Sequence, residues 1–99
     1  MAGEGAATVL VAQPDPDARE LLARVAEGAG HRAVRLDAAD PPEVVDAAVH
    51  ELALVVVVDT QSTSLDDVAA ITDAFTTRGY PAAVVALVDF RRDNGATYV

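Results

Sequence analysis

The chain has 99 residues, 52% of them hydrophobic, which fits one small domain with its own core. The formal net charge is −9, from 16 acidic and 7 basic residues, and all 7 bases are Arg. This acidity argues against binding to nucleic-acid phosphates or to an anionic membrane, because both need clustered cations. The absence of Cys excludes disulfides and thiolate metal sites.

The first residues differ in composition from the rest. Residues 1–6 are small or acidic and predict a flexible tail, whereas residues 7–99 are expected to form the domain. No basic start with an apolar core, as in a signal peptide, is present. The longest apolar run, residues 52–58, is too short to span a bilayer. We therefore expect a cytoplasmic protein.

The first predicted strand and helix occupy residues 8–30. Residues 8–12 form a continuous Val-rich run, typical of a strand covered on both faces. Asp15 before Pro16 is a typical helix start, and Gly28 and Gly30 end the helix. The spacing predicts that one face of this helix packs on the sheet. That face consists of Leu21, Leu22, Val25 and Ala26.

The second strand and helix follow in residues 33–52. Residues 33–36 are shorter and more polar, which suits an edge strand. Asp40 before Pro41 repeats the helix-start signal. The apolar stripe of this helix is expected to consist of Val44, Val45, Ala48 and Leu52.

Two further apolar runs, residues 54–58 and 82–88, predict buried strands with a helix between them. Ser64 and Asp67 resemble a capping box at the start of that helix, and Gly79 ends it. Strands and helices thus alternate along the whole chain. This alternation predicts an α/β domain with parallel strands joined by right-handed crossovers.

Polar residues stand where the predicted strands end, which is where ligands bind in parallel sheets. Gln13, Pro14 and Asp15 follow the first strand, and Asp59 follows four valines. Asp59 has two interpretations: a strand-ending residue in a turn, or a site residue that is active or vestigial. The polar residues 62–64 are expected to serve in the following turn and cap, and His31 and His50 lack metal-ligand partners.

These strand ends resemble the receiver domains of response regulators. Residues 9–16 (VLVAQPDP) resemble the first strand of that family, and residues 54–59 (LVVVVD) resemble the third, which ends in the phosphoacceptor. Residues 81–86 resemble the fourth strand, with Ala86 at the switch position. Residues 94–99 resemble the fifth strand, with Tyr98 at the switch aromatic. The resemblance implies a flavodoxin-like, doubly wound sheet in the order 2-1-3-4(-5), shortened at its C-terminal end.

The departures from the receiver pattern concern its chemistry. Phosphoryl transfer to a carboxylate needs Mg²⁺, which the family holds with acids beside the acceptor. Here Gln13 and Pro14 replace those acids, and Asp15 reads mainly as a helix cap. Ala86 has no hydroxyl group, and the phosphate-pairing Lys of the family is missing. The resemblance therefore implies a degenerate pocket around Asp59 without a metal or another cofactor.

The sequence leaves three hypotheses about the function of the chain. The first is an atypical receiver-like module of bacterial signalling or transcription control, which is not an enzyme and is not conventionally phosphorylated. The second is a phosphoreceiver of the two-component type that uses Asp59, with Mg²⁺. The third is a nucleotide-binding or enzymatic flavodoxin-like protein. For the first, we expect one face near the third and fourth strands to be uncovered and to bind a protein partner or a second copy as a homodimer.

Overall fold

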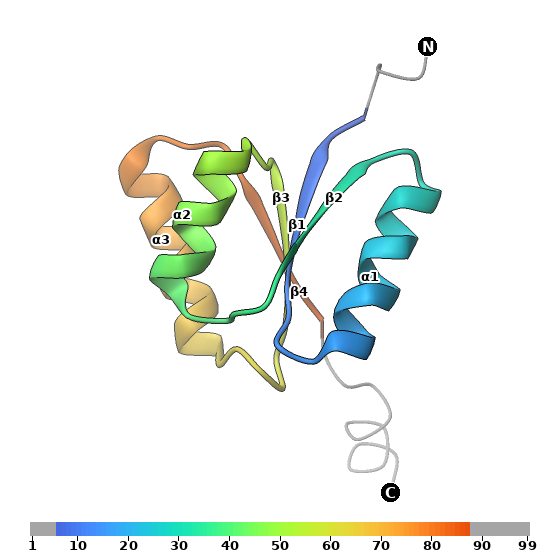
Figure 1. Ribbon diagram of the computed structural model, residues 1–99. Coiled ribbons are helices and arrows are strands. Elements are labelled where there is room, and N and C mark those ends of the chain that lie inside the picture. Colours follow the sequence, from blue (N-terminus) through green and yellow to red (C-terminus); the bar gives the residue numbers. More distant parts are fainter. Residues whose placement is uncertain (1–5, 88–99) are drawn as a thin grey trace, which may run out of the picture.

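The computed structural model describes residues 6–87 as one layered α/β unit (Figure 1). Its elements are β1 (Thr8–Ala12), α1 (Pro16–Gly28), β2 (Arg32–Leu36), α2 (Pro41–Glu51), β3 (Val55–Asp59), α3 (Leu65–Arg78) and β4 (Ala83–Leu87). All pairings are parallel, in the order β2-β1-β3-β4, so the predicted α/β, flavodoxin-like arrangement is confirmed. The expected fifth strand at residues 94–99 and the tail at residues 1–5 lie outside the described residues.

Two helices cover one face of the sheet and one covers the other. Figure 1 shows α1 alone on one side and α2 with α3 on the opposite side. The larger core lies beneath α2 and α3, where Leu10, Val56 and Phe75 are almost fully buried. The smaller core lies beneath α1 and contains Val9, Val11 and Ala23. Within residues 6–87, no helix has the length and hydropathy needed to cross a bilayer.

Two of the three predicted helix starts form the expected side-chain caps. Asp15 accepts a hydrogen bond from the Ala18 amide at 3.3 Å, and Ser64 accepts one from the Asp67 amide at 3.1 Å. The prediction for Asp40 was only partly right. It stands at the N-cap of α2 but makes no side-chain cap bond. Proline in the first turn, with its fixed φ, favours that start without the bond.

The C-terminus of α2 differs from the prediction. Leu52 does not extend the apolar stripe of α2, because it caps the helix in the left-handed conformation with φ 58° and is 71% exposed. Gly79 ends α3 with a similar φ of 69°, as its sequence position predicts. The left-handed region costs little for glycine but disfavours a residue with a Cβ atom.

Tyr80 fastens the loop before β4 to the end of α2. Its hydroxyl donates to the Ala53 carbonyl at 2.8 Å and lies 3.3 Å from the Ala48 carbonyl. Its ring lies 5.7 Å from that of Phe75, centroid to centroid. The hydroxyl thus contacts one carbonyl in the last turns of α2 and one in the residue pair that follows the helix.

The expected packing face of α1 was half wrong. Leu22 and Ala26 pack on the sheet, but Leu21 and Val25 are each 64% exposed. We call Leu21 and Val25 the α1 ridge. With α1 in this rotation, two acids on its other flank, Glu20 and Glu27, reach the edge strand β2.

Arg35 of β2 holds α1 through both acids. Its guanidinium lies 2.8 Å from a Glu20 carboxylate oxygen and 3.2 Å from one of Glu27. The hydrogen bonds from Arg35, and then those from Arg24, lower the pKa of Glu20 from 4.5 to about 2. The hydrogen bond to Glu20 in turn raises the pKa of Arg35. The α1–β2 contact is therefore an ion-pair cluster as well as an apolar one.

Strands β3 and β4 are covered on one face only. Val56 and Val58 are fully buried beneath α2 and α3, whereas their neighbours in β3 are partly exposed and Val85 of β4 is 42% exposed. We call the exposed side the open face, and it consists of Val55, Val57, Ala83, Val85 and Leu87. The prediction of an uncovered face near the third and fourth strands is confirmed for the part of the chain that the structure describes.

Candidate functional site: the carboxyl edge of the sheet

The three crossovers bring the expected polar residues to one edge of the sheet. Gln13 directly follows β1, and Asp59 is the last residue of β3, which pairs with β1. Because the strands are parallel, the loops after them converge, and each helix begins at the same edge. Gln13 bonds to the Asp59 side chain and to the Asp15 amide, so these three residues lie in one neighbourhood.

Gln13 is the centre of this neighbourhood. Its side chain is almost fully buried, with 1% exposed, although it is polar. The Nε2 group donates to Asp59 Oδ2 at 3.1 Å. The Oε1 atom accepts from Ser62 Oγ and from the Asp15 amide, each at 3.1 Å. A carbonyl oxygen has two acceptor sites, so both are in use, and only this orientation of the amide places a donor against the carboxylate.

Asp59 has a donor for each carboxylate oxygen. Gln13 serves Oδ2, and the Gln61 amide donates to Oδ1 at 2.8 Å. The second bond closes a turn of the kind Asp favours after a strand. Asp59 therefore occupies both of its predicted roles, as a turn residue and as the acid at the mouth of the sheet. Both donors are neutral.

Arg19, the cation nearest to Gln13 in sequence, binds main-chain carbonyls and an acid in another loop. Arg19 donates to the Gln13 carbonyl at 2.9 Å and to the Pro14 carbonyl at 3.2 Å, and it pairs with Asp37 at 3.3 Å. It therefore fastens the loop after β1 to the loop after β2. Among residues 6–87, none of the ion pairs involves Asp59.

Sequence reasoning missed Arg19. Its position in the first turn of α1, shortly after the loop it binds, was the available signal. A long side chain at an exposed helix start has many partners within reach, and only the folded structure shows which of them it binds. The Ser62 bond to Gln13 adds to the turn role expected for residues 62–64.

Pro14 and Ala86 contribute no reactive side chain. Pro14 is exposed and offers only its carbonyl oxygen. Ala86 pairs in register with Val58, while Leu87 pairs with Asp59, so Ala86 belongs to the sheet face beneath α3. A methyl group there can neither donate nor accept. Tyr98 lies outside the described residues.

Thr63 is a polar residue without a partner beside this network. Its amide donates to the Asp59 carbonyl at 2.8 Å, so the loop position is fixed. Its hydroxyl is completely buried and makes no hydrogen bond within the described structure. A buried hydroxyl in this state costs free energy relative to one exposed to water.

Metal binding finds no support in this arrangement. Nowhere between residues 6 and 87 do three or more His, Cys, Asp or Glu side chains come together as a possible ligand group. The side-chain oxygen of Gln13 already accepts two hydrogen bonds, and the Asp15 side chain caps α1. Comparison with protein-family models, with curated proteins and with solved structures found no match. The function must therefore be argued from this geometry.

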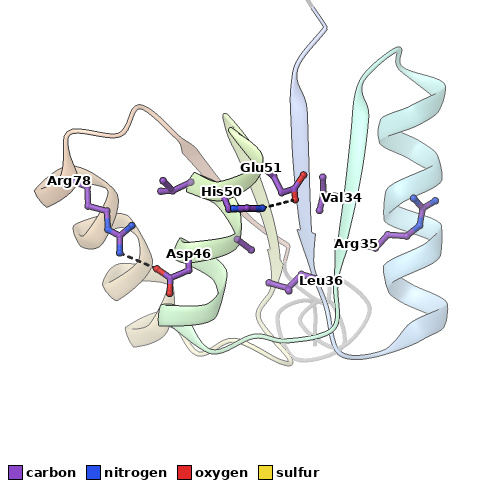
Figure 2. A pocket seen from close by; sticks show the side chains of 9 residues that line it. Val34, Arg35, Leu36, Asp46, His50, Glu51 and Arg78 are labelled. Atoms are coloured by element: carbon purple, nitrogen blue, oxygen red, sulfur yellow. Dashed lines mark hydrogen bonds and ion pairs between the residues drawn. The ribbon is translucent and has the colours of Figure 1, made fainter.

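A surface groove lies away from Asp59. It is an open groove of about 720 Å³ between β2 and α2, lined by Val34, Leu36 and neighbouring charged residues (Figure 2). Arg78 pairs with Asp46 at 3.1 Å, and His50 lies 4.0 Å from Glu51. Because these charges are matched within the chain, the groove presents neither a set of convergent donors nor a net charge for a ligand.

Proposed function

We propose that the chain is a regulatory and interaction module with a receiver-like architecture, which acts through protein contacts and has no catalytic activity. One observation supports this most strongly: both oxygens of Asp59 are occupied by neutral N–H donors, and one of these is the buried amide of Gln13. In this proposal the carboxylate holds two loops in place, the one after β1 and the one after β3. It ties the ends of β1 and β3 together, and through Ser62 and Asp15 it fixes the starts of the loops that follow.

Among residues 6–87 no ion pair reaches Asp59, and this supports the proposal physically. Phosphoryl transfer to a carboxylate brings two anionic groups together, and a divalent cation normally offsets that repulsion. At about 4 Å and an effective dielectric near 20, the repulsion between two unit charges is roughly 4 kcal/mol. An amide N–H supplies only a partial positive charge, and Arg19 is committed to two carbonyls and Asp37.

A phosphoreceiver remains the second candidate, because Asp59 lies at the carboxyl edge and is only partly buried. Phosphorylation there would break the bond from Gln13 and would use Asp15 and main-chain oxygens to hold Mg²⁺. Asp15 would then lose its role as the cap of α1. This cost makes the candidate weaker than a module that works through protein contacts alone.

The two functions are separated by exposing the full chain to Mg²⁺ with a small phosphodonor, and separately with beryllofluoride. We expect no acid-labile gain in intact mass and no shift in melting temperature. A gain of one phosphoryl group that disappears in Asp59→Ala would contradict the proposal and establish the phosphoreceiver. Glu43→Ala, a change of an exposed acid on α2, is the matched control for the loss of one carboxylate.

The proposal places this module in the cytoplasm, without a cofactor and without direct contact to nucleic acid. Its partner is a protein or a second copy of the chain. A nucleotide-binding or enzymatic role would instead produce a melting shift with nucleotides or flavins. We expect no shift with either, and a saturable shift would require the proposal to be replaced.

A further inference from the structure

The α1 side of the sheet is only half covered. α1 packs on β1 and β2, and in residues 6–87 no helix lies over β3 and β4 on that side (Figure 1). The open face lies beside the helix and its five members have apolar side chains, while Asp59, which pairs with Leu87, stands at its carboxyl end. All-parallel sheets are almost always covered on both faces, so a half-covered one is unusual.

The α1 ridge is part of the same surface. Side chains on a helix are spaced by about 100° per residue. Glu20 and Glu27 point toward Arg35 on the edge strand, while Ala23 points into the sheet. This spacing places Leu21 and Val25 on the outer side of α1, with Val25 turned toward the half of the sheet that α1 leaves uncovered. The exposed apolar α1 ridge thus lies next to the open face.

The open face spans two of the four strands, as many as α1 covers on the same side. On the other face, α2 contacts β1 and β2 while α3 contacts β4, so two helices cover four strands. On the α1 face a single helix covers two strands. A second helix could therefore lie over β3 and β4 at the usual helix separation of about 8–10 Å from α1.

We infer that a second copy of this chain packs its own α1 on the open face, so that one layer of two helices lies between the two sheets. A two-fold axis parallel to the strands exchanges the covered and uncovered halves of the α1 face. Leu21 and Val25 of each copy then lie against the open face of the other, and the two Val25 side chains meet near the axis. The contact is isologous, because the same surface is used twice.

The area is sufficient for a weak dimer. α1 has 13 residues and is therefore about 20 Å long and about 10 Å wide. Two helix-on-sheet contacts and one helix–helix contact bury on the order of 1,000 Å² in total, which is the lower limit for a specific interface. We therefore expect a dimer that forms with a concentration dependence in the micromolar range.

The negative net charge of the chain should make this dimer depend on the salt concentration. Each copy carries −9, and a two-fold axis along the strands places both carboxyl edges at the same end of the assembly. The ridge and the open face are apolar, but Asp59 ends β3 beside Leu87, so the repulsion acts at the carboxyl end of the contact and outside it. Since salt screens exposed charges beyond about 10 Å at 0.1 M, added salt should strengthen the dimer.

The test uses the full chain in sedimentation velocity and light scattering over a wide concentration range, at low and high NaCl. We expect a monomer–dimer equilibrium that shifts toward dimer with salt. Val25→Glu and Val85→Glu should each weaken the dimer at least tenfold. Leu65→Glu is the matched control, because Leu65 is 72% exposed and starts α3 on the opposite face. Circular dichroism confirms that each variant is folded.

A cross-link tests the symmetry, since the chain has no Cys of its own. Val25→Cys should form a disulfide-linked dimer under mild oxidation, whereas Leu65→Cys should not. A wild-type monomer at the highest concentration would overturn the inference, as would a dimer that both glutamate variants leave intact. The inference rests on the proposed function, but the outcomes are distinct: phosphorylation of Asp59 would contradict only that function, and a monomer only the dimer.

Discussion

At the scale of single residues, the sequence predicted which side chains meet and the structure added how they bond. Gln13 and Asp59 could be placed together because parallel strands end at one edge. The orientation of the Gln13 amide could not be predicted, because it depends on Ser62 and on a main-chain amide in another loop. Arg19 could not be predicted either, since a flexible side chain selects its partners only in the folded chain.

The polarity of the Gln13–Asp59 bond can be reversed by two substitutions. Asp59→Asn alone sets an amide N–H against the Gln13 N–H, and we expect a loss of about 1–3 kcal/mol in the free energy of unfolding. Gln13→Glu alone sets two carboxylates face to face and should cost a similar amount or more. The double substitution restores a donor against an acceptor.

Denaturant unfolding of the four proteins gives the coupling energy between the two positions. We expect a favourable coupling of more than about 1 kcal/mol, so that the double variant is more stable than the sum of the single changes allows. Additive losses would show that the two side chains do not share this bond. Exposed Glu43→Gln on α2 controls for a change of one charge.

The buried hydroxyl of Thr63 gives a second prediction at this scale. Thr63→Val keeps the shape of the side chain and removes an unpaired polar group, so it should stabilise the fold by about 1 kcal/mol. Thr63→Ala is the comparison, because it removes the hydroxyl and also leaves a cavity. Thermal unfolding measures both. A clear loss of stability in Thr63→Val would mean that the hydroxyl has a partner, such as a water molecule.

At the scale of elements, the caps and strand runs were predicted well, and the rotation of α1 was not. Four apolar residues of α1 span more than one side of the helix, and periodicity alone does not show which pair faces the sheet. The observed rotation also lets Glu20 and Glu27 pair with Arg35 on β2, which is remote in sequence from the start of α1. An apolar stripe that is broader than the contact with the sheet thus leaves some of its residues exposed.

The Glu20–Arg35 contact makes the stability of the α1–β2 pair depend on pH. The pKa of Glu20 is lowered from 4.5 to about 2, so its contribution is fully present above pH 4.5. It is lost progressively as the pH falls from there through about 2. Glu20→Gln should therefore be less stable than the wild type at pH 7, and this difference should shrink toward zero near pH 2.

Unfolding curves for both proteins at several pH values measure that difference. Asp73→Asn, a change of an exposed acid in α3 with no ion pair among the described contacts, is the matched control. Its difference from the wild type should change less over the same range. A Glu20→Gln difference that does not vary with pH would contradict the assigned role of the Arg35 bond.

The ends of α2 and α3 form a natural pair for comparing left-handed caps. Leu52 and Gly79 have φ of 58° and 69°, and only the second is glycine. Leu52→Gly should stabilise the protein by up to about 1 kcal/mol, because Leu52 is exposed and glycine relieves the strain. Gly79→Ala should destabilise it by about 1 kcal/mol. Chemical denaturation measures both, and a destabilised Leu52→Gly would show that the Leu52 side chain makes contacts worth more than the strain.

At the scale of the whole molecule, the fold class followed from the alternation of strands and helices, and the order of the four described strands agrees with the one predicted. What alternation could not predict is the balance of charge along the strand axis. All three described helices start at the carboxyl edge, and acids gather there in loops and first turns. They are Asp15, Asp17, Asp37, Asp40, Glu43, Asp59, Asp66 and Asp67.

This crowding predicts that salt stabilises the fold. Helix N-termini favour nearby acids, but the acids also repel one another, and Arg19 is the one described cation in their midst. Single exposed ion pairs contribute only about 0–1 kcal/mol each, so their screening should matter less than relief of the repulsion. The free energy of unfolding should rise between low and moderate NaCl. A steady fall would show that the Arg pairs dominate instead.

The uneven placement of charge also gives the molecule a direction. Arg32 and Arg78 lie toward the amino ends of the strands, away from the acid-rich edge. Within residues 6–87, the side-chain charges thus form an electric dipole aligned with the sheet. On a positively charged surface or resin it should adsorb with the acid-rich end down, so that the turns leading into β2, β3 and β4 face the solution and stay accessible to antibodies or proteases.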